Sequence, residues 1–96
     1  MAAAVVWSQE AEDDFEAICH YMERQSFQLA NQWGDRLIEK IELLKQFPEM
    51  GRVVPEKEVH FIREIFVGDY RLIYAYQNSI VNLLAIKHQA SQLGKL

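Results

Sequence analysis

The sequence has little of several features that mark particular classes of protein. Its 96 residues include one cysteine, Cys19, and two prolines. A single cysteine excludes an internal disulfide and fits a reducing compartment, so we expect a cytoplasmic protein. No apolar run approaches the ~20 residues of a membrane span, and the apolar residues 1–7 lack the basic leader of a signal peptide. The length indicates one domain over residues 1–96, without membrane association.

Positive charge is also scarce. The net charge is −4, with 14 acids and 10 lysines and arginines. Residues 1–51 hold ten of the acids and four of the bases, and residues 52–96 hold four acids and six bases. Domains that bind nucleic acid usually carry a net basic charge. We therefore expect no direct DNA binding, and any contact with phosphate would need a local patch in the second half.

Apolar spacing predicts a short strand and two helices in the first half of the chain. Residues 3–7 read as a strand, and Ser8 is placed to cap a helix. Two sets of apolar residues recur at helical spacing and are expected to face the core: Ala11, Phe15, Ile18 and Met22, then Leu29, Trp33, Leu37, Ile41 and Leu44. The pause at 25–26 predicts an α-hairpin, and Pro48 ends the second helix before a loop over residues 48–58.

Acidic residues cluster at the start of the first predicted helix, at Glu10, Glu12, Asp13 and Asp14. Carboxylates there stabilise a helix through its dipole. Without paired histidines or a glycine-bearing loop they are weak evidence for a metal. We therefore predict neither a metal nor a cofactor.

The second half predicts a β-meander. Two β-rich runs within residues 61–76 flank Gly68-Asp69, a dipeptide that suits a two-residue hairpin turn, and a third run covers residues 80–87. Helices followed by strands indicate an α+β fold of order β-α-α-β-β-β, with the N-terminal α-hairpin packed on a twisted, mostly antiparallel sheet. The first strand is expected to join the meander.

Alternation along the strands predicts two faces. The Gly68-Asp69 turn places Phe66 opposite Arg71 and Arg63 opposite Tyr74, and a three-residue turn at 77–79 would place Arg71 opposite Ala85 and Ile73 opposite Leu83. The face away from the helices then mixes apolar and charged side chains, which is typical of a surface that binds another protein. The alternative is a cross-strand pair of Glu64 and Arg71 with little consequence. The residues predicted to bind a partner are Arg63, Glu64, Phe66, Arg71, Ile73, Leu83 and Lys87.

Four segments together resemble the ParE/RelE superfamily, the toxins of type II toxin–antitoxin modules often called plasmid stabilisation proteins. They are 47–52 (Phe-Pro-Glu-Met-Gly-Arg), 62–64 (Ile-Arg-Glu), 68–74 (Gly-Asp-Tyr-Arg-Leu-Ile-Tyr) and 84–88 (Leu-Ala-Ile-Lys-His). The resemblance covers nearly the whole chain, including Trp7-Ser8 near the start. It implies a cognate antitoxin that wraps and blocks the toxin, and either of two activities. ParE-like members inhibit DNA gyrase, whereas RelE-like members cut mRNA in the ribosome.

The resemblance assigns roles to three residues if the chain is RelE-like. Arg71 would bind the reacting phosphate, Lys87 would be a second cation, and His88 would be the general acid. The tail 89–96 departs from the nuclease pattern because Lys95 is its only charged residue. Together with the acidic helices, this favours a ParE-like gyrase inhibitor that acts by protein–protein contact. A ribosome-dependent endonuclease and an inactive partner-binding scaffold are the alternatives.

Overall fold

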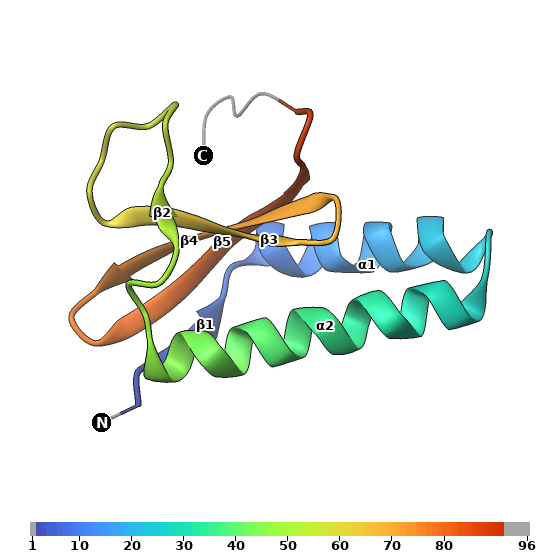
Figure 1. Ribbon diagram of the computed structural model, residues 1–96, viewed down its shortest axis with the longest axis horizontal. Coiled ribbons are helices and arrows are strands. Elements are labelled where there is room, and N and C mark those ends of the chain that lie inside the picture. The colour runs from blue at the N-terminus through green and yellow to red at the C-terminus, as the bar shows by residue number, and fades with distance from the viewer. Residues whose placement is uncertain (1, 92–96) are drawn as a thin grey trace.

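The computed structural model describes residues 2–91, which form two helices and five strands (Figure 1). The elements in chain order are β1 (Ala4–Trp7), α1 (Gln9–Glu23), α2 (Phe27–Gln46), β2 (Arg52–Val53), β3 (Ile62–Val67), β4 (Tyr70–Gln77) and β5 (Ile80–His88). No helix among residues 2–91 is long and apolar enough to cross a membrane. Most of the tail that departs from the nuclease pattern, residues 92–96, lies outside the described part of the chain.

The two helices form the predicted α-hairpin. The Ser8 hydroxyl accepts a hydrogen bond from the Ala11 N–H at 3.0 Å, and Ser26 caps α2 in the same way through the Leu29 N–H at 3.2 Å. In Figure 1 the two helices run side by side, with α2 below α1. Their buried residues pack against the sheet in the main core: Ala11, Ile18, Met22, Ala30, Trp33, Leu37, Ile41 and Leu44 from the helices, and Ile65, Val67, Leu72, Tyr74, Val81, Leu83 and Ile86 from the strands.

The sheet has the strand order β1-β5-β4-β3-β2. β1 pairs in parallel with β5, and the other neighbours are antiparallel. The fold is therefore α+β as predicted, with the first strand joined to the meander. The prediction of an uninterrupted loop over residues 48–58 was wrong, because Arg52 and Val53 add a short strand opposite Glu64 and Arg63.

The register of the meander was predicted correctly on one side and wrongly on the other. Phe66 opposes Arg71 and Arg63 opposes Tyr74, as the Gly68-Asp69 turn requires, with Gly68 at a φ of +60°. The second turn has two residues rather than three, since Asn78 and Ser79 both adopt positive φ and Gln77 pairs with Ile80. Arg71 consequently opposes Lys87, and Ile73 opposes Ala85.

The two-residue turn sets the face that Leu83 occupies, and a β-bulge follows Leu83 in β5. Ile73 opposes Ala85 but Tyr74 opposes Leu83, so Leu84 is an extra residue in β5. Leu83 faces the helices and is fully buried in the main core. Its predicted place on the opposite face was wrong, because the prediction assumed a three-residue turn at 77–79.

The face of the sheet away from the helices is not open. Val54, at the start of the connection between β2 and β3, is fully buried against Ile73 and Ala85, and Ile62 and Leu84 pack beside it. This second core is small and apolar, and it occupies the middle of the face that the sequence predicted to be a docking surface. The charged residues of that face lie next to it.

Candidate functional site

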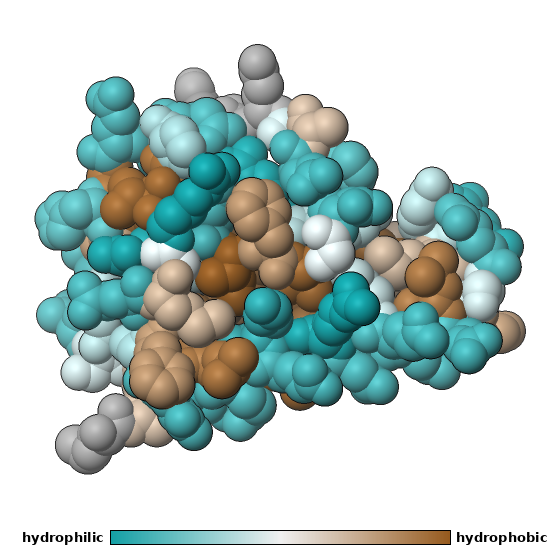
Figure 2. All heavy atoms as spheres, in the orientation of Figure 1, coloured by the Kyte–Doolittle hydropathy of each residue, from teal (hydrophilic) through white to brown (hydrophobic). Residues whose placement is uncertain are grey.

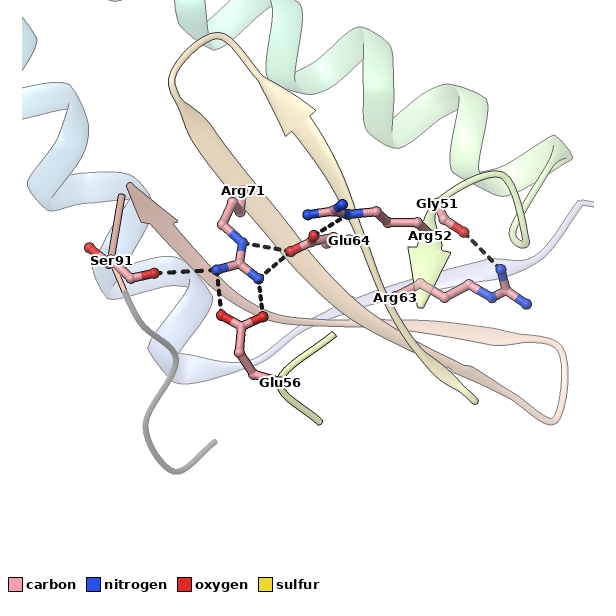
Figure 3. Close-up of polar contacts among 7 residues, drawn as sticks. All are labelled: Gly51, Arg52, Glu56, Arg63, Glu64, Arg71 and Ser91. Atoms are coloured by element: carbon pink, nitrogen blue, oxygen red, sulfur yellow. Dashed lines mark hydrogen bonds and ion pairs between the residues drawn. The ribbon is translucent and has the colours of Figure 1, made fainter. Parts of the chain in front are cut away.

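Arg71 lies in β4 and is buried, with only 4 % of its surface exposed. Its Nε donates to Glu64 Oε1 at 2.6 Å, and its Nη1 and Nη2 donate to the two carboxylate oxygens of Glu56 at 3.0 and 2.9 Å (Figure 3). Nη2 also pairs with Glu64 Oε1, and Nη1 reaches the Ser91 carbonyl at 3.3 Å. A guanidinium has five N–H donors. All five have an acceptor within the chain.

Glu64 is the deepest charge of this cluster, with 1 % of its surface exposed. One carboxylate oxygen faces Arg71, and the other accepts from Arg52 Nε. Two cations and two carboxylates therefore alternate in the order Arg52, Glu64, Arg71, Glu56, as Figure 3 shows. Buried charges are tolerated only when they are paired and hydrogen-bonded. Among the described residues no buried side-chain nitrogen or oxygen lacks a partner.

The electrostatics hold Arg71 as a cation. Hydrogen bonds to Glu56 raise the pKa of Arg71, burial opposes that shift, and Glu64 adds to it. The cation is nonetheless already neutralised by its two carboxylates. A phosphate could contact the guanidinium only by displacing Glu56, which occupies the paired Nη1 and Nη2 donors that a phosphate would use. In this arrangement Arg71 holds parts of the fold together, and its donors are not available to bind an anion.

Lys87 in β5 pairs in register with Arg71 in the neighbouring strand β4, but its ammonium group turns toward α1. Its Nζ lies 3.1 Å from Glu10 Oε2 and 3.2 Å from Asp14 Oδ2. Burial alone would lower the pKa of Lys87, and hydrogen bonds to Glu10 and Asp14 reverse this, so that its pKa is raised. Lys87 and Arg71 are thus neighbours in register but point to different carboxylates.

His88 lies at the end of β5, and its ring meets the ring of Tyr70 edge-on at 5.5 Å. Its Nδ1 accepts a hydrogen bond from the Ala90 N–H at 3.1 Å. The residue is exposed and faces the side of Tyr70 rather than the guanidinium of Arg71. The structure therefore does not join Arg71, Lys87 and His88 into one cluster.

The remaining predicted partner-binding residues differ in accessibility. Phe66 is 42 % exposed. The guanidinium carbon of Arg52 lies over its ring, 5.4 Å from the centre of the Phe66 ring. Arg63 is half-buried and donates to the Gly51 carbonyl at 2.7 Å. Ile73 and Leu83 are fully buried in the two cores. Direct contact with a partner is therefore open to Phe66, and not to Ile73 or Leu83 in this arrangement.

Asp14 has a contact that its place among the N-terminal acids did not predict. Its Oδ2 accepts the backbone N–H of Ile86 at 2.9 Å. β1 ends at Trp7, opposite Leu83, so the remainder of β5 has no neighbouring strand on that side. Asp14 supplies an acceptor there and ties α1 to the sheet. Among residues 2–91 no group of three or more His, Cys, Asp or Glu residues could hold a metal ion.

Sequence reasoning missed Arg52 and Glu56 as members of the central cluster. Both belong to the segment predicted as a loop, where no periodicity assigns a side chain to a face. The available signal was the surplus of charges on the predicted second face, since buried charges require partners of opposite sign. That signal indicates that partners exist without indicating which residues they are.

The comparisons with known proteins agree with this fold. A family described as "ParE toxin of type II toxin-antitoxin system, parDE" matches residues 5–93. The chromosomal ParDE toxin–antitoxin system from P. aeruginosa has a similar structure, with a TM-score of 0.72 and 20 % identity over 91 % of this chain and 96 % of that one. The RelBE2 toxin–antitoxin complex from Mycobacterium tuberculosis is similar at a TM-score of 0.60 and 18 % identity, over 92 % of this chain and 99 % of that one.

No sequence among the curated proteins matches the chain. At identities of 20 % and below, the structural likenesses establish the α+β fold that the sequence predicted. The family model is matched by the sequence itself, over residues 5–93. On that match, the chain belongs to the ParE toxin family of type II toxin–antitoxin systems.

Proposed function

We propose that this toxin inhibits DNA gyrase by protein–protein contact in the cytoplasm and is neutralised by a cognate antitoxin. Membership of the ParE family motivates the proposal. The observation that carries it is the state of Arg71, whose five N–H donors are all taken by acceptors of the same chain. The residue best placed by sequence to bind a reacting phosphate is thus committed to the fold.

The distribution of charge supports the same proposal. The chain carries a net charge of −4, and α1 holds six acids without a lysine or arginine. A protein that works on RNA within the ribosome faces dense negative charge and is helped by free cations. Arg52, Arg71 and Lys87 are instead each paired with carboxylates of the chain.

Exposed apolar side chains supply what a protein partner would contact. Phe47, Met50 and Val53 lie in the seven residues from the end of α2 to the end of β2, and each is well exposed. On the face shown in Figure 2, apolar atoms gather in patches among hydrophilic ones, one of them over the C-terminal end of α2. Apolar residues bordered by polar ones are typical of interaction surfaces. The antitoxin and gyrase are the partners we propose for such surfaces.

The proposal is tested by inducing the chain in cells that lack an antitoxin and recovering plasmid DNA and total RNA from the same culture. Inhibition of gyrase predicts loss of negative supercoiling in the plasmid while transcripts stay intact. The matched control is Leu37→Asp, which places a charge at a fully buried position and should abolish the fold and the effect together.

Two results would count against the proposal. Cleaved transcripts with normal plasmid topology would favour the ribosome-dependent endonuclease, and Arg71→Ala would then be examined for loss of cleavage. Normal growth with normal topology would favour a scaffold that binds a partner without toxicity.

A further inference from the structure

A hollow of about 500 Å³ lies where the end of β1 meets the flank of α1. Its lining residues are Trp7 from β1 and Glu12, Phe15, Glu16, Cys19 and His20 from α1. This volume falls within the range of small-molecule sites in proteins, which are mostly apolar and hold a few polar groups that orient the ligand. None of its lining residues belongs to the Arg71 cluster.

Two aromatic rings form a corner of this hollow. The ring centroids of Trp7 and Phe15 lie 5.7 Å apart, and their planes are inclined at 63°. Phe15 also stacks on the buried Trp33 at 6.0 Å, which holds the corner against the core. Trp7 and Phe15 are only half-buried, so part of each ring is open to the hollow. Aromatic faces attract organic cations, and tryptophan attracts them most strongly.

The rim of the hollow carries an excess of negative charge. Glu12 and Glu16 are exposed and lie four residues apart, on the same side of α1. Among residues 2–91 Glu12 has no ion pair, and Glu16 pairs only with His20, whose Nε2 lies 3.7 Å from Glu16 Oε1. His20 also faces Glu23 at 3.7 Å. The carboxylates thus outnumber the one group that can become positive, so a ligand of complementary charge is a cation.

Two other uses of these side chains fit less well. Among residues 2–91 no group of His, Cys, Asp or Glu residues could hold a metal ion, so Glu12, Glu16 and His20 do not form a metal centre. Burial raises the pKa of the Cys19 thiol, and the carboxylate of Glu23 raises it further. The thiol therefore stays protonated near neutral pH and adds a small apolar surface to the hollow rather than a nucleophile.

We propose that this hollow binds a small organic cation in which an ammonium group is attached to an apolar body. The ammonium group lies over the ring of Trp7 with Glu12 and Glu16 beside it, and the apolar body rests on Phe15 and Cys19. The site does not depend on whether gyrase is the target of the toxin.

The test uses ¹⁵N-labelled full-length chain and three probes of similar shape and different charge: 2-phenylethylamine, 2-phenylethanol and 3-phenylpropanoate. The amine should shift the indole N–H resonance of Trp7 and the amide resonances of Cys19 and His20. The alcohol should bind about tenfold more weakly, because it lacks the charge that the ring and the carboxylates attract. The anion should not bind, and added salt should weaken binding of the amine.

Two variants separate the contributions of charge and ring. Glu12→Gln with Glu16→Gln keeps the shape of the rim but removes its charge, so the preference for the amine over the alcohol should fall to about twofold or less. Trp7→Leu keeps an apolar wall without an aromatic face and should weaken the amine more than the alcohol. The matched control is Glu39→Gln, an exposed position on α2 outside the hollow, which should leave both affinities unchanged.

Several results would overturn the proposal. Equal binding of the amine and the alcohol, or an unchanged preference in the Glu12 and Glu16 double variant, would remove the role of charge. Shifts confined to another surface, or no binding of the amine at millimolar concentration, would remove the site. Tighter binding of N-acetyl-lysine methylamide than of the amine would identify a protein side chain as the occupant, and self-association of the chain through Trp7 in sedimentation experiments would identify a second copy.

Discussion

Arg71 and Glu64 are buried together on neighbouring strands, where the Nε of Arg71 donates to Glu64 Oε1 at 2.6 Å. Glu64 also holds Arg52, and Arg71 also holds Glu56, so one pair links β2, β3, β4 and the connection between β2 and β3. The charges that looked like a docking surface in the sequence are the polar interior of that face. Removing these charges should therefore lower the free energy of unfolding.

The first prediction concerns Glu64→Ala. The variant leaves Arg71 and Arg52 without their shared carboxylate, and breaking a buried pair costs about 3–5 kcal/mol. Urea unfolding should show a loss of that size in the free energy of unfolding. A loss below about 1 kcal/mol would mean that water or another carboxylate replaces Glu64 readily.

The double variant Glu64→Met with Arg71→Met is the control for this prediction. It removes both charges and fills the space with apolar atoms, so it should lose much less stability than the sum of the two single variants. Additive losses would show that the two side chains are not coupled.

The second prediction concerns Tyr74, whose hydroxyl donates to the Pro48 carbonyl at 2.8 Å and accepts from the Gly51 N–H at 3.0 Å. Burial raises the pKa of Tyr74. The unfolded phenol ionises near pH 10. Because the folded chain keeps its proton longer, the stability that Tyr74 contributes is full below about pH 10 and is lost as the pH rises further.

Tyr74→Phe tests this dependence. It should lower the free energy of unfolding by about 1–3 kcal/mol at pH 8, since the Gly51 N–H and the Pro48 carbonyl lose their partner. The difference between the two proteins should shrink at pH 11. Burial also raises the pKa of Tyr70, which is present in both proteins and so cancels in the comparison. A difference that stays constant with pH would contradict the assignment.

The third prediction compares two glycines. A Cβ at Gly51 would lie 2.6 Å from the Glu64 carbonyl oxygen and 2.6 Å from the Tyr74 hydroxyl, whereas a Cβ at Gly34 would meet nothing within 4 Å. Gly51→Ala should destabilise the fold by about 1–3 kcal/mol through overpacking. Gly34→Ala, inside α2, should stabilise it by up to about 1 kcal/mol because alanine is the better helix former. Equal effects in thermal melts would contradict the packing described around Gly51.

Much of the fold follows from short-range patterns in the sequence. The caps at Ser8 and Ser26 and the apolar spacing of both helices are local, and the Gly68-Asp69 turn correctly sets the register of β3 against β4. The register of β4 against β5 did not follow, because its turn requires positive φ at Asn78 and Ser79, which most residues other than glycine avoid. The bulge at Leu84 depends on packing across the whole sheet and has no local signature.

The candidate site was predictable only in part. Alternation placed Glu64 and Arg71 on one face, which the structure confirms. Glu56 is 15 residues from Arg71 in an irregular connection, so neither strand nor helix spacing relates the two. Ile73 lies on its predicted face, but its burial beneath Val54 is a long-range feature of packing. Leu83 lies on the other face because the turn at Asn78 and Ser79 has two residues rather than three.

The most direct test of the proposed function is a supercoiling assay with purified gyrase, relaxed plasmid and ATP. Increasing amounts of the refolded chain should reduce the supercoiled product, and heat-denatured chain should not. Added RNA should leave this inhibition unchanged, because the proposed contact is with protein. Full supercoiling activity at a large molar excess of folded chain would contradict the proposal that this ParE-family toxin acts on gyrase.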